Sequence, residues 1–380
     1  MKIPFNKPFL TGLETTYIEQ SVKIGKISGD GPFTKKCHEY MESRYGFKKV
    51  LLTTSCTDAL EMAAILANIS EGDEVIAPSY TFVSTVNAFV LRGAKIIFCD
   101  SKENHPNIDE DKIESLITSK TKVIIPVHYA GFACNMDKIM EIASKYNLIV
   151  VEDAAQAIDN YFIGSNQEPR VLGSIGHLAT FSFHETKNII SGEGGMLVIN
   201  DESFISRAEI IREKGTNRSA FFKGEVDKYS WVDIGSSFLP SDIIAAFLFA
   251  QLENLDLIQE KRKSVWNVYN SKLSKFKDKN YFKLPEIPSY STNNGHMYYL
   301  ILNDSETRDE LIVYLKNNNI GAVFHYLSLN KSPYFNGAQS LINSDKFSDT
   351  LLRLPLYYDI ELNEIEFVCD KIIQFFTEKN

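Results

Sequence analysis

The chain alternates short apolar runs with amphipathic stretches from about residue 48 onward. The apolar runs are rich in Val and Ile and alternate little with polar residues, which is typical of strands buried on both faces of a sheet. The predicted strands are Lys49–Thr53, Glu74–Ala77, Lys95–Cys99, Lys122–Val127, Leu148–Val151 and Ala179–Phe183, and the predicted helices between them are Thr57–Asn68, Thr81–Leu91, Asp109–Ile117 and Met136–Tyr146. This succession predicts an α/β fold in which helices cover both faces of a mostly parallel sheet.

The pattern changes after about residue 240. A long helical pattern rich in Ala, Leu, Gln, Glu and Lys extends over Ser241–Leu273. Beyond it we predict two strands and two helices, which are His296–Leu302, Glu306–Asn317, Ala322–Tyr326 and Asn363–Phe376. This part is too short to repeat the first. We therefore expect a large domain over residues 1–254, with the N-terminal segment included, and a smaller α+β domain over residues 255–380.

Composition narrows the class of protein. The 380 residues are 44% apolar, enough for a sizeable core, and the net charge of −9 without a Lys/Arg-rich block argues against a nucleic-acid surface. No apolar run approaches the roughly 18 residues of a membrane span, and the first residues do not form a secretory signal. Five scattered cysteines without a CxxC pattern are typical of free thiols in a reducing cytoplasm. We expect a cytoplasmic protein that binds no nucleic acid, membrane or metal.

An acid and an amine stand 34 residues apart, each at the end of a predicted strand. Asp153 follows the run Leu148–Val151, and Lys187 lies in the turn after Ala179–Phe183. Ligands of open α/β sheets bind at the carboxyl ends of strands. Pyridoxal phosphate needs a lysine amine for its Schiff base and an acid against its pyridinium nitrogen. The pair therefore points to pyridoxal phosphate, although an acid and a base in unrelated surface turns would give the same pattern.

Two other segments suit the same cofactor. Ser55 and Thr57 stand between a strand and a helix, where free N–H groups form an anion site, and Ser182 adds another hydroxyl. Ordinary helix capping explains the same residues. Phe82 or Tyr80 follows a strand at the same end of the sheet and offers a ring to stack on the cofactor, whereas core packing is the commoner fate of an aromatic side chain.

Other chemistries are less well supported. No GxGxxG opens a βαβ unit, and no GxxxxGK[ST] occurs. Cys56 as a nucleophile is less favoured than Cys56 as a buried, inert thiol. His177 and His184 do not form a metal spacing with nearby acids.

The chain resembles the DegT/DnrJ/EryC1/StrS family of sugar aminotransferases over essentially its whole length. The motifs that carry the resemblance are Gly-Asp-Gly-Pro-Phe-Thr near the start, Pro-Ser-Tyr-Thr-Phe-Val-Ser-Thr, Val-Glu-Asp-Ala-Ala-Gln, Ser-Phe-His-Glu-Thr-Lys-Asn and Gly-Glu-Gly-Gly. The resemblance implies the fold of the fold-type I, aspartate aminotransferase-like enzymes that depend on pyridoxal phosphate. In that fold a mostly parallel seven-stranded sheet is followed by a smaller C-terminal α+β domain.

The resemblance also implies roles around the cofactor ring. Lys187 corresponds to the Schiff-base lysine, and Asp153 to the partner of the pyridinium nitrogen. Gln156 corresponds to the residue near the phenolic oxygen of the ring, and Phe82 occupies the stacking position.

The cofactor phosphate has its own implied partners. Ser55 and Cys56 would bind it mainly through backbone amides, and Ser182 through its hydroxyl. Relatives donate an Asn from the neighbouring subunit, and Ser237 stands at that position here, which implies a homodimer with shared active sites. Many relatives also have a His where this chain has Asn330, so a role at that position is in doubt.

The resemblance implies a substrate. An amino group would pass from L-glutamate to the C4 ketone of dTDP-4-dehydro-6-deoxy-D-glucose, giving dTDP-4-amino-4,6-dideoxy-D-galactose for polysaccharides such as O-antigen or enterobacterial common antigen. Lys214, Arg218 and Lys223 offer charge to the diphosphate, although a solvated basic face explains them equally well. His325 and Tyr326 would flank the sugar. Amination giving the gluco epimer, or amination at C3, stays open.

Two other functions are compatible with such a fold. A sugar dehydratase of this fold has His in place of the Schiff-base lysine, and the presence of Lys187 argues against it. A non-catalytic regulatory protein would be expected to lose Asp153 or Lys187, and both are present.

Overall fold

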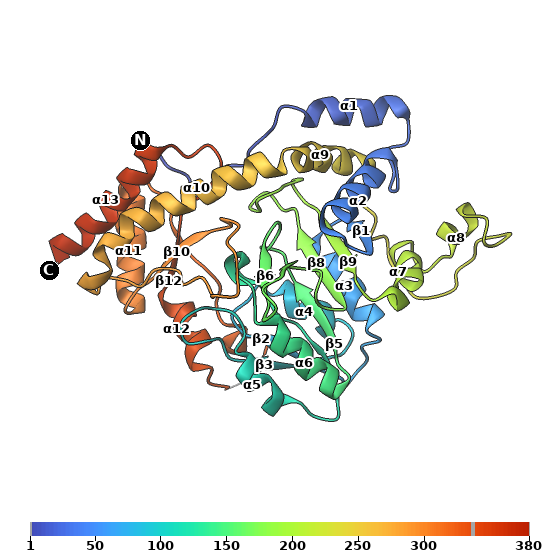
Figure 1. Ribbon diagram of the computed structural model, residues 1–380, viewed down its shortest axis with the longest axis horizontal. Coiled ribbons are helices and arrows are strands. Elements are labelled where there is room, and N and C mark those ends of the chain that lie inside the picture. The colour runs from blue at the N-terminus through green and yellow to red at the C-terminus, as the bar shows by residue number, and fades with distance from the viewer. Residues whose placement is uncertain (1, 336–338, 380) are drawn as a thin grey trace.

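The computed structural model describes residues 2–335 and 339–379, and its larger part is built on a seven-stranded sheet (Figure 1). The strand order is β1-β9-β8-β5-β4-β2-β3, and only β9 runs antiparallel to its neighbours. The strands are β1 (Lys49–Thr53), β2 (Glu74–Pro78), β3 (Lys95–Cys99), β4 (Thr121–Ile124), β5 (Ile149–Asp153), β8 (Leu178–Ser182) and β9 (Gly195–Ile199). The predicted fold class is confirmed.

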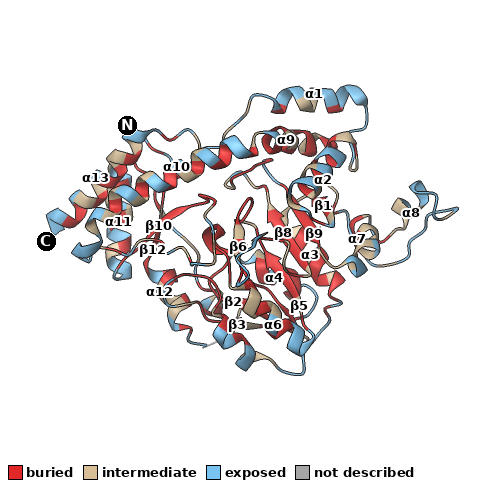
Figure 2. Cartoon of the chain, viewed as in Figure 1, coloured by how far each residue is buried: buried red, intermediate tan, exposed pale blue. Residues whose placement is uncertain are grey.

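Helices cover both faces of this sheet, as expected for strands whose apolar residues do not alternate with polar ones. Neighbouring residues of β1 show the arrangement, since Val50 and Leu51 belong to two different hydrophobic cores. One face is covered by α3 (Cys56–Leu66), α4 (Ser84–Val90) and α7 (Ile205–Arg212), and the other by α2 (Pro32–Tyr45), α5 (Glu110–Ile113), α6 (Met136–Tyr146) and α9 (Asp242–Glu253). Figure 2 shows the consequence, with buried strands at the centre and exposed outer helix faces.

A smaller unit follows the sheet along the chain and has a core of its own. Its three-stranded antiparallel sheet has the order β10-β12-β11, with β10 (Tyr298–Ile301), β11 (Val323–Phe324) and β12 (Leu351–Leu354). Its helices are α10 (Leu255–Leu273), α11 (Ser305–Asn317), α12 (Ile342–Thr350) and α13 (Leu362–Lys379). The first residues of the chain lie on this unit, since Ile3 pairs with Ile320.

Several element boundaries differ from the sequence prediction. The single pattern over Ser241–Leu273 is two helices, because the chain leaves the helical conformation at Asn254. The helix predicted at Thr81 begins at Ser84, which leaves Thr81 and Phe82 in a loop. The helix expected over Asp109–Ile117 is α5 followed by a 3₁₀ turn. The 3₁₀ turns are Glu114–Leu116, Tyr129–Gly131, Glu202–Phe204, Ser274–Lys279 and Leu329–Lys331.

The remaining elements are short or polar, and the sequence pattern did not predict them, just as it did not predict α2, β9, α7, α12 and β12. They are α1 (Glu14–Ile24), α8 (Arg218–Phe222) and the two-stranded pair β6 (Tyr161–Ile163) and β7 (Pro169–Val171). Helix α8 stands away from the body of the molecule (Figure 1). Within the described residues, no helix has the length and apolar character needed to cross a membrane.

A buried carboxylate fixes the start of α2 against α9. Asp242 Oδ1 accepts hydrogen bonds from the N–H and hydroxyl of Thr34, at 2.8 and 2.9 Å, and Oδ2 accepts from Phe33 N–H and Ser21 Oγ, at 3.3 and 3.2 Å. Gly31 permits this approach, because a Cβ there would lie 2.3 Å from the carboxylate carbon. Asp242→Ala leaves several buried donors without a partner, and we expect it to lower the free energy of unfolding by about 3 kcal/mol, measured by urea denaturation.

A matched control tests whether burial causes this loss. Asp256 forms an ion pair with Arg44 at 2.5 Å, but its side chain is 79% exposed. Exposed ion pairs contribute little, so Asp256→Ala should cost less than about 1 kcal/mol. Equal losses in the two variants would contradict the role given to Asp242.

Candidate functional site

A cavity of about 630 Å³ lies where the carboxyl ends of the large sheet's parallel strands face the smaller unit. Its large-domain lining comes from the start of α3, the loop after β2, the end of β5 and the turn after β8. The smaller unit contributes its lining from His296, Phe324, His325, Tyr326 and Arg353. The position agrees with the rule that open α/β sheets bind ligands at the carboxyl ends of their strands.

Asp153 is the last residue of β5 and is buried at the floor of this cavity. Its Oδ2 accepts a hydrogen bond from Thr85 Oγ at 2.7 Å, and Oδ1 accepts from Ala155 N–H at 3.1 Å. Both carboxyl oxygens thus accept a hydrogen bond, so the local structure fixes the orientation of this side chain at the cavity. Thr85 comes from α4, which the sequence pattern did not mark as part of the site.

Lys187 lines the same cavity, in the turn after β8. Burial lowers the pKa of its amine, and the charge of Arg353 acts in the same direction, whereas Cys56 and Asp153 oppose the shift. Lys187 and Asp153 do not form an ion pair with each other, and within the described residues the Lys187 amine has no hydrogen-bond partner. The cavity therefore presents an acid and an uncommitted amine with space between them.

The start of α3 presents backbone N–H groups to the cavity. Ser55 caps the helix by accepting from Asp58 N–H at 3.0 Å, so the capping interpretation of its hydroxyl holds. The N–H groups of Cys56 and Thr57 precede the first helical bond, which Ala59 N–H donates to Ser55. Free N–H groups at a helix start bind phosphate, and this is the role expected of the Ser55 and Cys56 backbone.

A glycine allows this turn to pack against the sheet. A Cβ at Gly195, on β9, would lie 2.2 to 2.3 Å from backbone atoms of Ser55 and Cys56. Ser182, at the end of β8, also lines the cavity. Burial raises the pKa of the Cys56 thiol to about 12, so this cysteine is no nucleophile at neutral pH.

Tyr80 and Phe82, the two aromatic residues considered for stacking on the cofactor, lie in different environments. Tyr80 is 1% exposed, donates to the carbonyl of His325 and packs in the core of the smaller unit. Phe82 is 55% exposed and lines the cavity, 6.1 Å from the ring of Tyr326 between centroids. Phe82 is therefore the residue available for stacking.

Gln156 and residues of the smaller unit line another side of the cavity. Gln156 Oε1 accepts from Ala130 N–H at 2.7 Å, and its Nε2 donates to the hydroxyl of Tyr326 at 3.2 Å. His325 Nδ1 lies 2.8 Å from the hydroxyl of Tyr129, and burial keeps the pKa of His325 well below its usual range. These contacts fix the side chains expected near the ring and the sugar.

Four residues expected at the site do not line the cavity of their own chain, and one of them, Lys223, forms an ion pair with Glu209 at 2.6 Å. Lys214 and Arg218 belong to the projecting part that carries α8, where Arg218 lies 4.0 Å from Glu213 and over the ring of Phe222. Ser237 is exposed on the segment that pairs with Glu213. Within one chain, the structure does not bring these residues to Lys187.

Asn330 has a structural role. It is fully buried, its side-chain oxygen accepts from Ser79 Oγ at 2.5 Å, and its amide donates to the carbonyl of Gln339 at 2.7 Å. These bonds attach the smaller unit to the loop after β2.

The site also contains residues that the sequence analysis missed, above all Arg353 and His296. Arg353 stands in the otherwise apolar run Leu351-Leu-Arg-Leu-Pro-Leu, and this single charge was the available signal. His296 Nδ1 lies 2.7 Å from Asn188 Oδ1, and burial keeps the pKa of His296 well below its usual range.

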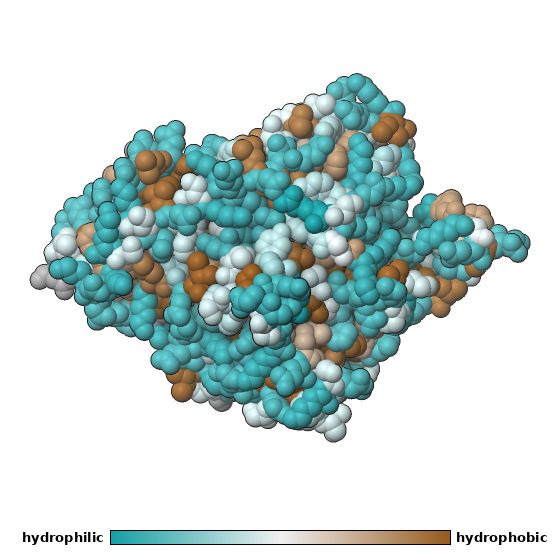
Figure 3. Space-filling view, in the orientation of Figure 1, coloured by the Kyte–Doolittle hydropathy of each residue, from teal (hydrophilic) through white to brown (hydrophobic). Residues whose placement is uncertain are grey.

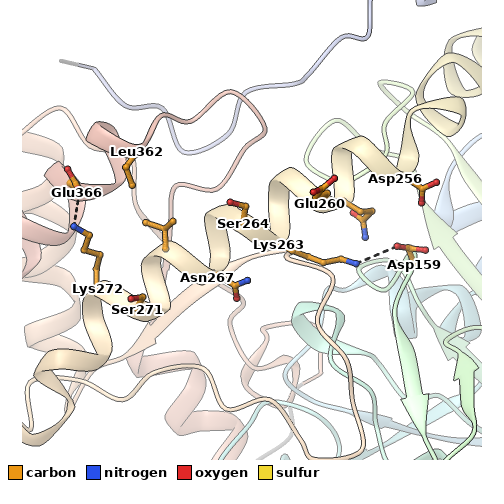
Figure 4. Close-up of a pocket in the computed structure, with 12 residues that line it drawn as sticks. Asp159, Asp256, Glu260, Lys263, Ser264, Asn267, Ser271, Lys272, Leu362 and Glu366 are labelled. Atoms are coloured by element: carbon orange, nitrogen blue, oxygen red, sulfur yellow. Dashed lines mark hydrogen bonds and ion pairs between the residues drawn. The ribbon is translucent and has the colours of Figure 1, made fainter.

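A larger hollow of about 780 Å³ runs along α10 and offers no comparable chemistry (Figure 4). Its lysines are already paired, Lys263 with Asp159 at 3.8 Å and Lys272 with Glu366 at 2.6 Å. In the part of the chain that the structure describes, no group of acids, histidines and cysteines could hold a metal ion.

The fold and the site together define a transferase of the aminotransferase type. The model of the DegT/DnrJ/EryC1/StrS aminotransferase family matches residues 10–373, and the chain belongs to this family. Membership of this family confirms the prediction of pyridoxal phosphate as cofactor.

Three relatives illustrate the likeness. GDP-perosamine synthase of Escherichia coli O157:H7 is 30% identical over 385 residues, covering 99% of each chain. The aminotransferase TlmJ from Streptoalloteichus hindustanus shares the fold, with a TM-score of 0.91, 24% identity and all of both chains covered. A putative sugar aminotransferase from Streptococcus pneumoniae, solved in its PLP form, has a TM-score of 0.88, with 24% identity and 98% of each chain covered.

Proposed function

We propose that this aminotransferase moves an amino group from L-glutamate to the C4 ketone of dTDP-4-dehydro-6-deoxy-D-glucose. The products are dTDP-4-amino-4,6-dideoxy-D-galactose and 2-oxoglutarate, the reaction of a dTDP-4-amino-4,6-dideoxygalactose transaminase. The observation that carries the proposal is the uncommitted amine of Lys187 opposite the oriented carboxylate of Asp153 in one cavity. Aminotransferase chemistry at a ketone needs both groups.

The residues present fit pyridoxal phosphate. The N–H groups at the start of α3 and the hydroxyl of Ser182 suit its phosphate, Phe82 suits a face of its ring, and Asp153 suits its ring nitrogen. When bound, pyridoxal phosphate supplies an electron-accepting ring that makes the neighbouring C–H bond acidic.

The chain's own groups then carry the proton and exclude water. The lowered pKa of Lys187 favours the neutral form of its amine, which takes a proton from the amino donor and returns it to the cofactor side. Asp153 holds negative charge against the ring nitrogen, where its bond from Thr85 keeps it oriented. Gln156 and Tyr326, joined by a 3.2 Å hydrogen bond, form a wall that limits how the sugar enters.

The release of 2-oxoglutarate tests this function. We expect L-glutamate alone to give no more than one 2-oxoglutarate per active site, and continued release only when the dTDP-linked keto sugar is present, measured by a coupled dehydrogenase assay. Release over many turnovers without the keto sugar would contradict the proposal.

A GDP-linked keto sugar is the second candidate, since a relative covering 99% of the chain is named GDP-perosamine synthase. The same assay with GDP-4-keto-6-deoxymannose separates the two. The gluco epimer and amination at C3 are separated by the structure of the product.

We also propose that the active unit is a homodimer in which the segment around α8 serves the neighbouring cavity. Lys214, Arg218 and Ser237 do not line their own cavity, so they contribute only from a second copy. The projecting segment exposes apolar side chains, as Figure 3 shows at its right-hand end. They are Phe222, Tyr229, Trp231, Val232 and Ile234.

Arg218→Ala tests the charged contact. A charged hydrogen bond to a diphosphate is worth about 1.5–3 kcal/mol, so the variant should raise the KM for the keto-sugar nucleotide at least about tenfold. The glutamate half-reaction should be unchanged, because glutamate carries no diphosphate. Lys263→Ala, which removes a positive charge on α10, is the matched control and should change neither value.

Mixed subunits test where Arg218 acts. In a hybrid of Lys187→Ala and Arg218→Ala subunits, one site combines the intact Lys187 with the intact Arg218 of the other chain. Random re-assortment should therefore recover about a quarter of wild-type activity at low sugar-nucleotide concentration. No recovery would place Arg218 at its own chain's site or outside the site altogether.

A further inference from the structure

His296 is a buried histidine of which only one ring nitrogen is engaged. It stands just before β10, is 4% exposed and lines the cavity that holds Lys187. Its Nδ1 atom lies 2.7 Å from Oδ1 of Asn188, the residue next to Lys187 in the chain. Among the described residues, the second ring nitrogen, Nε2, has no hydrogen-bond partner. This nitrogen is therefore free to bind a group in the cavity.

The hydrogen bonds around Asn188 decide which nitrogen of His296 carries the proton. Asn188 Nδ2 donates to Gln259 Oε1 at 2.8 Å and to the carbonyl of Asn294 at 3.0 Å. Gln259 Nε2 donates in turn to the carbonyl of Ile158 at 3.3 Å, so both amides are fixed in one orientation. Asn188 Oδ1 must then accept, and His296 Nδ1 is the donor.

The environment of the His296 ring keeps it neutral. Burial holds the pKa of His296 well below its usual range. Basic neighbours act in the same direction, and in order of effect they are Lys187, Arg353, Arg262 and His325. A neutral imidazole whose proton is on Nδ1 has a bare lone pair on Nε2. The cavity thus contains a hydrogen-bond acceptor that stays unprotonated among several basic groups.

Of these neighbours, Lys187 gains most from such an acceptor. Arg262 already donates to the carbonyls of Gly295 and His296, at 3.2 and 2.8 Å. Arg353 keeps its charge at every step, because a guanidinium is not deprotonated in proteins. Lys187 differs, because it alternates between amine and ammonium when it moves a proton. Its charge also has the largest effect of the four on His296.

We propose that His296 Nε2 accepts a hydrogen bond from the Lys187 ammonium and positions this group while it holds the proton. No covalent bond forms or breaks, and the proton stays on Lys187, because the pKa of His296 is held well below its usual range. The bond stabilises the ammonium more than the amine, so it raises the pKa of Lys187 against the lowering effect of burial. His296 is a positioning residue, and this role rests on the proposed function.

Two substitutions separate the two nitrogens of the ring. In His296→Asn the new amide nitrogen stands near the place of Nδ1 and can donate to Asn188, but nothing replaces Nε2. In His296→Gln the longer side chain brings an amide oxygen to the place of Nε2. A contact through Nε2 should therefore be lost in His296→Asn and largely kept in His296→Gln. A purely structural role through Asn188 would give the opposite order.

The pKa of Lys187 in the cofactor-free protein is the first measurement. Competitive labelling with acetic anhydride, followed by mass spectrometry of the peptide that contains Lys187, reports the fraction of neutral amine at each pH. We expect the midpoint in His296→Asn to lie about one pH unit below that of the wild type, as for loss of a charged hydrogen bond, and the midpoint in His296→Gln to move much less. Lys145, exposed and paired with Glu114, is the internal control and should label alike in all three proteins.

The first half-reaction of the holoenzyme gives the second measurement. The contact supports Lys187 while it moves the proton and does not bind the amino donor. We therefore expect His296→Asn to slow the step with L-glutamate about tenfold to a hundredfold at saturation, and to change the L-glutamate concentration for half-maximal rate by less than about twofold. His296→Gln should recover most of the lost rate.

The two measurements decide between these roles. An unchanged labelling midpoint in His296→Asn would overturn the proposal, and so would a larger shift in His296→Gln than in His296→Asn. Labelling needs no substrate, so a shift in a protein that never aminates a sugar nucleotide would uphold the contact and refute the proposed function. If His296→Asn does not fold, as judged by circular dichroism, His296→Phe takes its place in both measurements, because it keeps a ring there without a lone pair.

Discussion

Lys187→Ala should abolish turnover while leaving the fold and the cofactor affinity largely intact. In the proposed mechanism the amine is both the attachment point for the cofactor and the base that moves the proton, so the two contributions vanish together. We expect a loss of about 10⁴-fold or more in kcat, measured under saturating substrates. The backbone N–H groups at the start of α3 and the ring of Phe82, which we propose as partners of the cofactor, remain, so the cofactor should still bind without a covalent link.

Two further measurements make this result specific. Borohydride treatment should add the mass of the reduced cofactor to the wild type and not to Lys187→Ala, as seen by intact-protein mass spectrometry. Lys145→Ala removes an exposed lysine paired with Glu114 at 2.5 Å and should behave as wild type. Turnover of Lys187→Ala within tenfold of wild type would rule out this lysine as the catalytic residue.

Asp153→Asn should have the second largest effect. The substitution keeps the shape of the side chain but removes the negative charge at the end of β5. Without that charge the ring nitrogen loses its proton more easily, and the ring accepts electrons less well. We expect the glutamate half-reaction, followed by stopped-flow absorbance, to slow by about 10²–10³-fold.

A companion variant distinguishes charge from position. Thr85→Val removes the 2.7 Å hydrogen bond to Asp153 and leaves the charge in place. It should slow the same half-reaction by only about tenfold, as expected for one lost hydrogen bond. A half-reaction that is unchanged in Asp153→Asn would show that Asp153 does not face the ring nitrogen.

The sequence predicted those elements best whose ends carry a local signal. Helix α6 begins and ends as predicted, because Asn135 caps its start and Asn147 adopts the left-handed conformation at its end. The strands β1 and β3 also match, since both are short apolar runs between polar residues. Asp153 and Lys187 were singled out because one stands at the end of such a strand and the other in the turn after one.

The missed part of the site depends on pairings between distant segments. Arg353 reaches the cavity because β12 pairs with β10 and β11, and its Cα faces those of Tyr299 and Val323. No local pattern encodes that pairing, and one charge in an apolar run reads as an exposed residue. The break between α9 and α10 at Asn254 was missed for a related reason, because both helices continue one apolar pattern.

The segment that contains Lys214 and Arg218 shows a different limit of prediction from sequence. Lys214 and Arg218 lie in a stretch of sequence whose positive charges are typical of phosphate binding. In the structure they lie away from Lys187, on the part that bears α8. Sequence proximity to a motif says nothing about which copy's cavity a residue serves. The mixed-subunit experiment addresses this directly.

Transfer of ¹⁵N from L-glutamate to the sugar tests the central claim most directly. We expect the holoenzyme, incubated with ¹⁵N-glutamate and dTDP-4-dehydro-6-deoxy-D-glucose, to give a product whose NMR spectrum shows ¹⁵N bonded to C4 of a 4-amino-4,6-dideoxygalactose. Label that stays in glutamate, with the keto sugar unchanged in both its dTDP-linked and its GDP-linked form, would contradict the account.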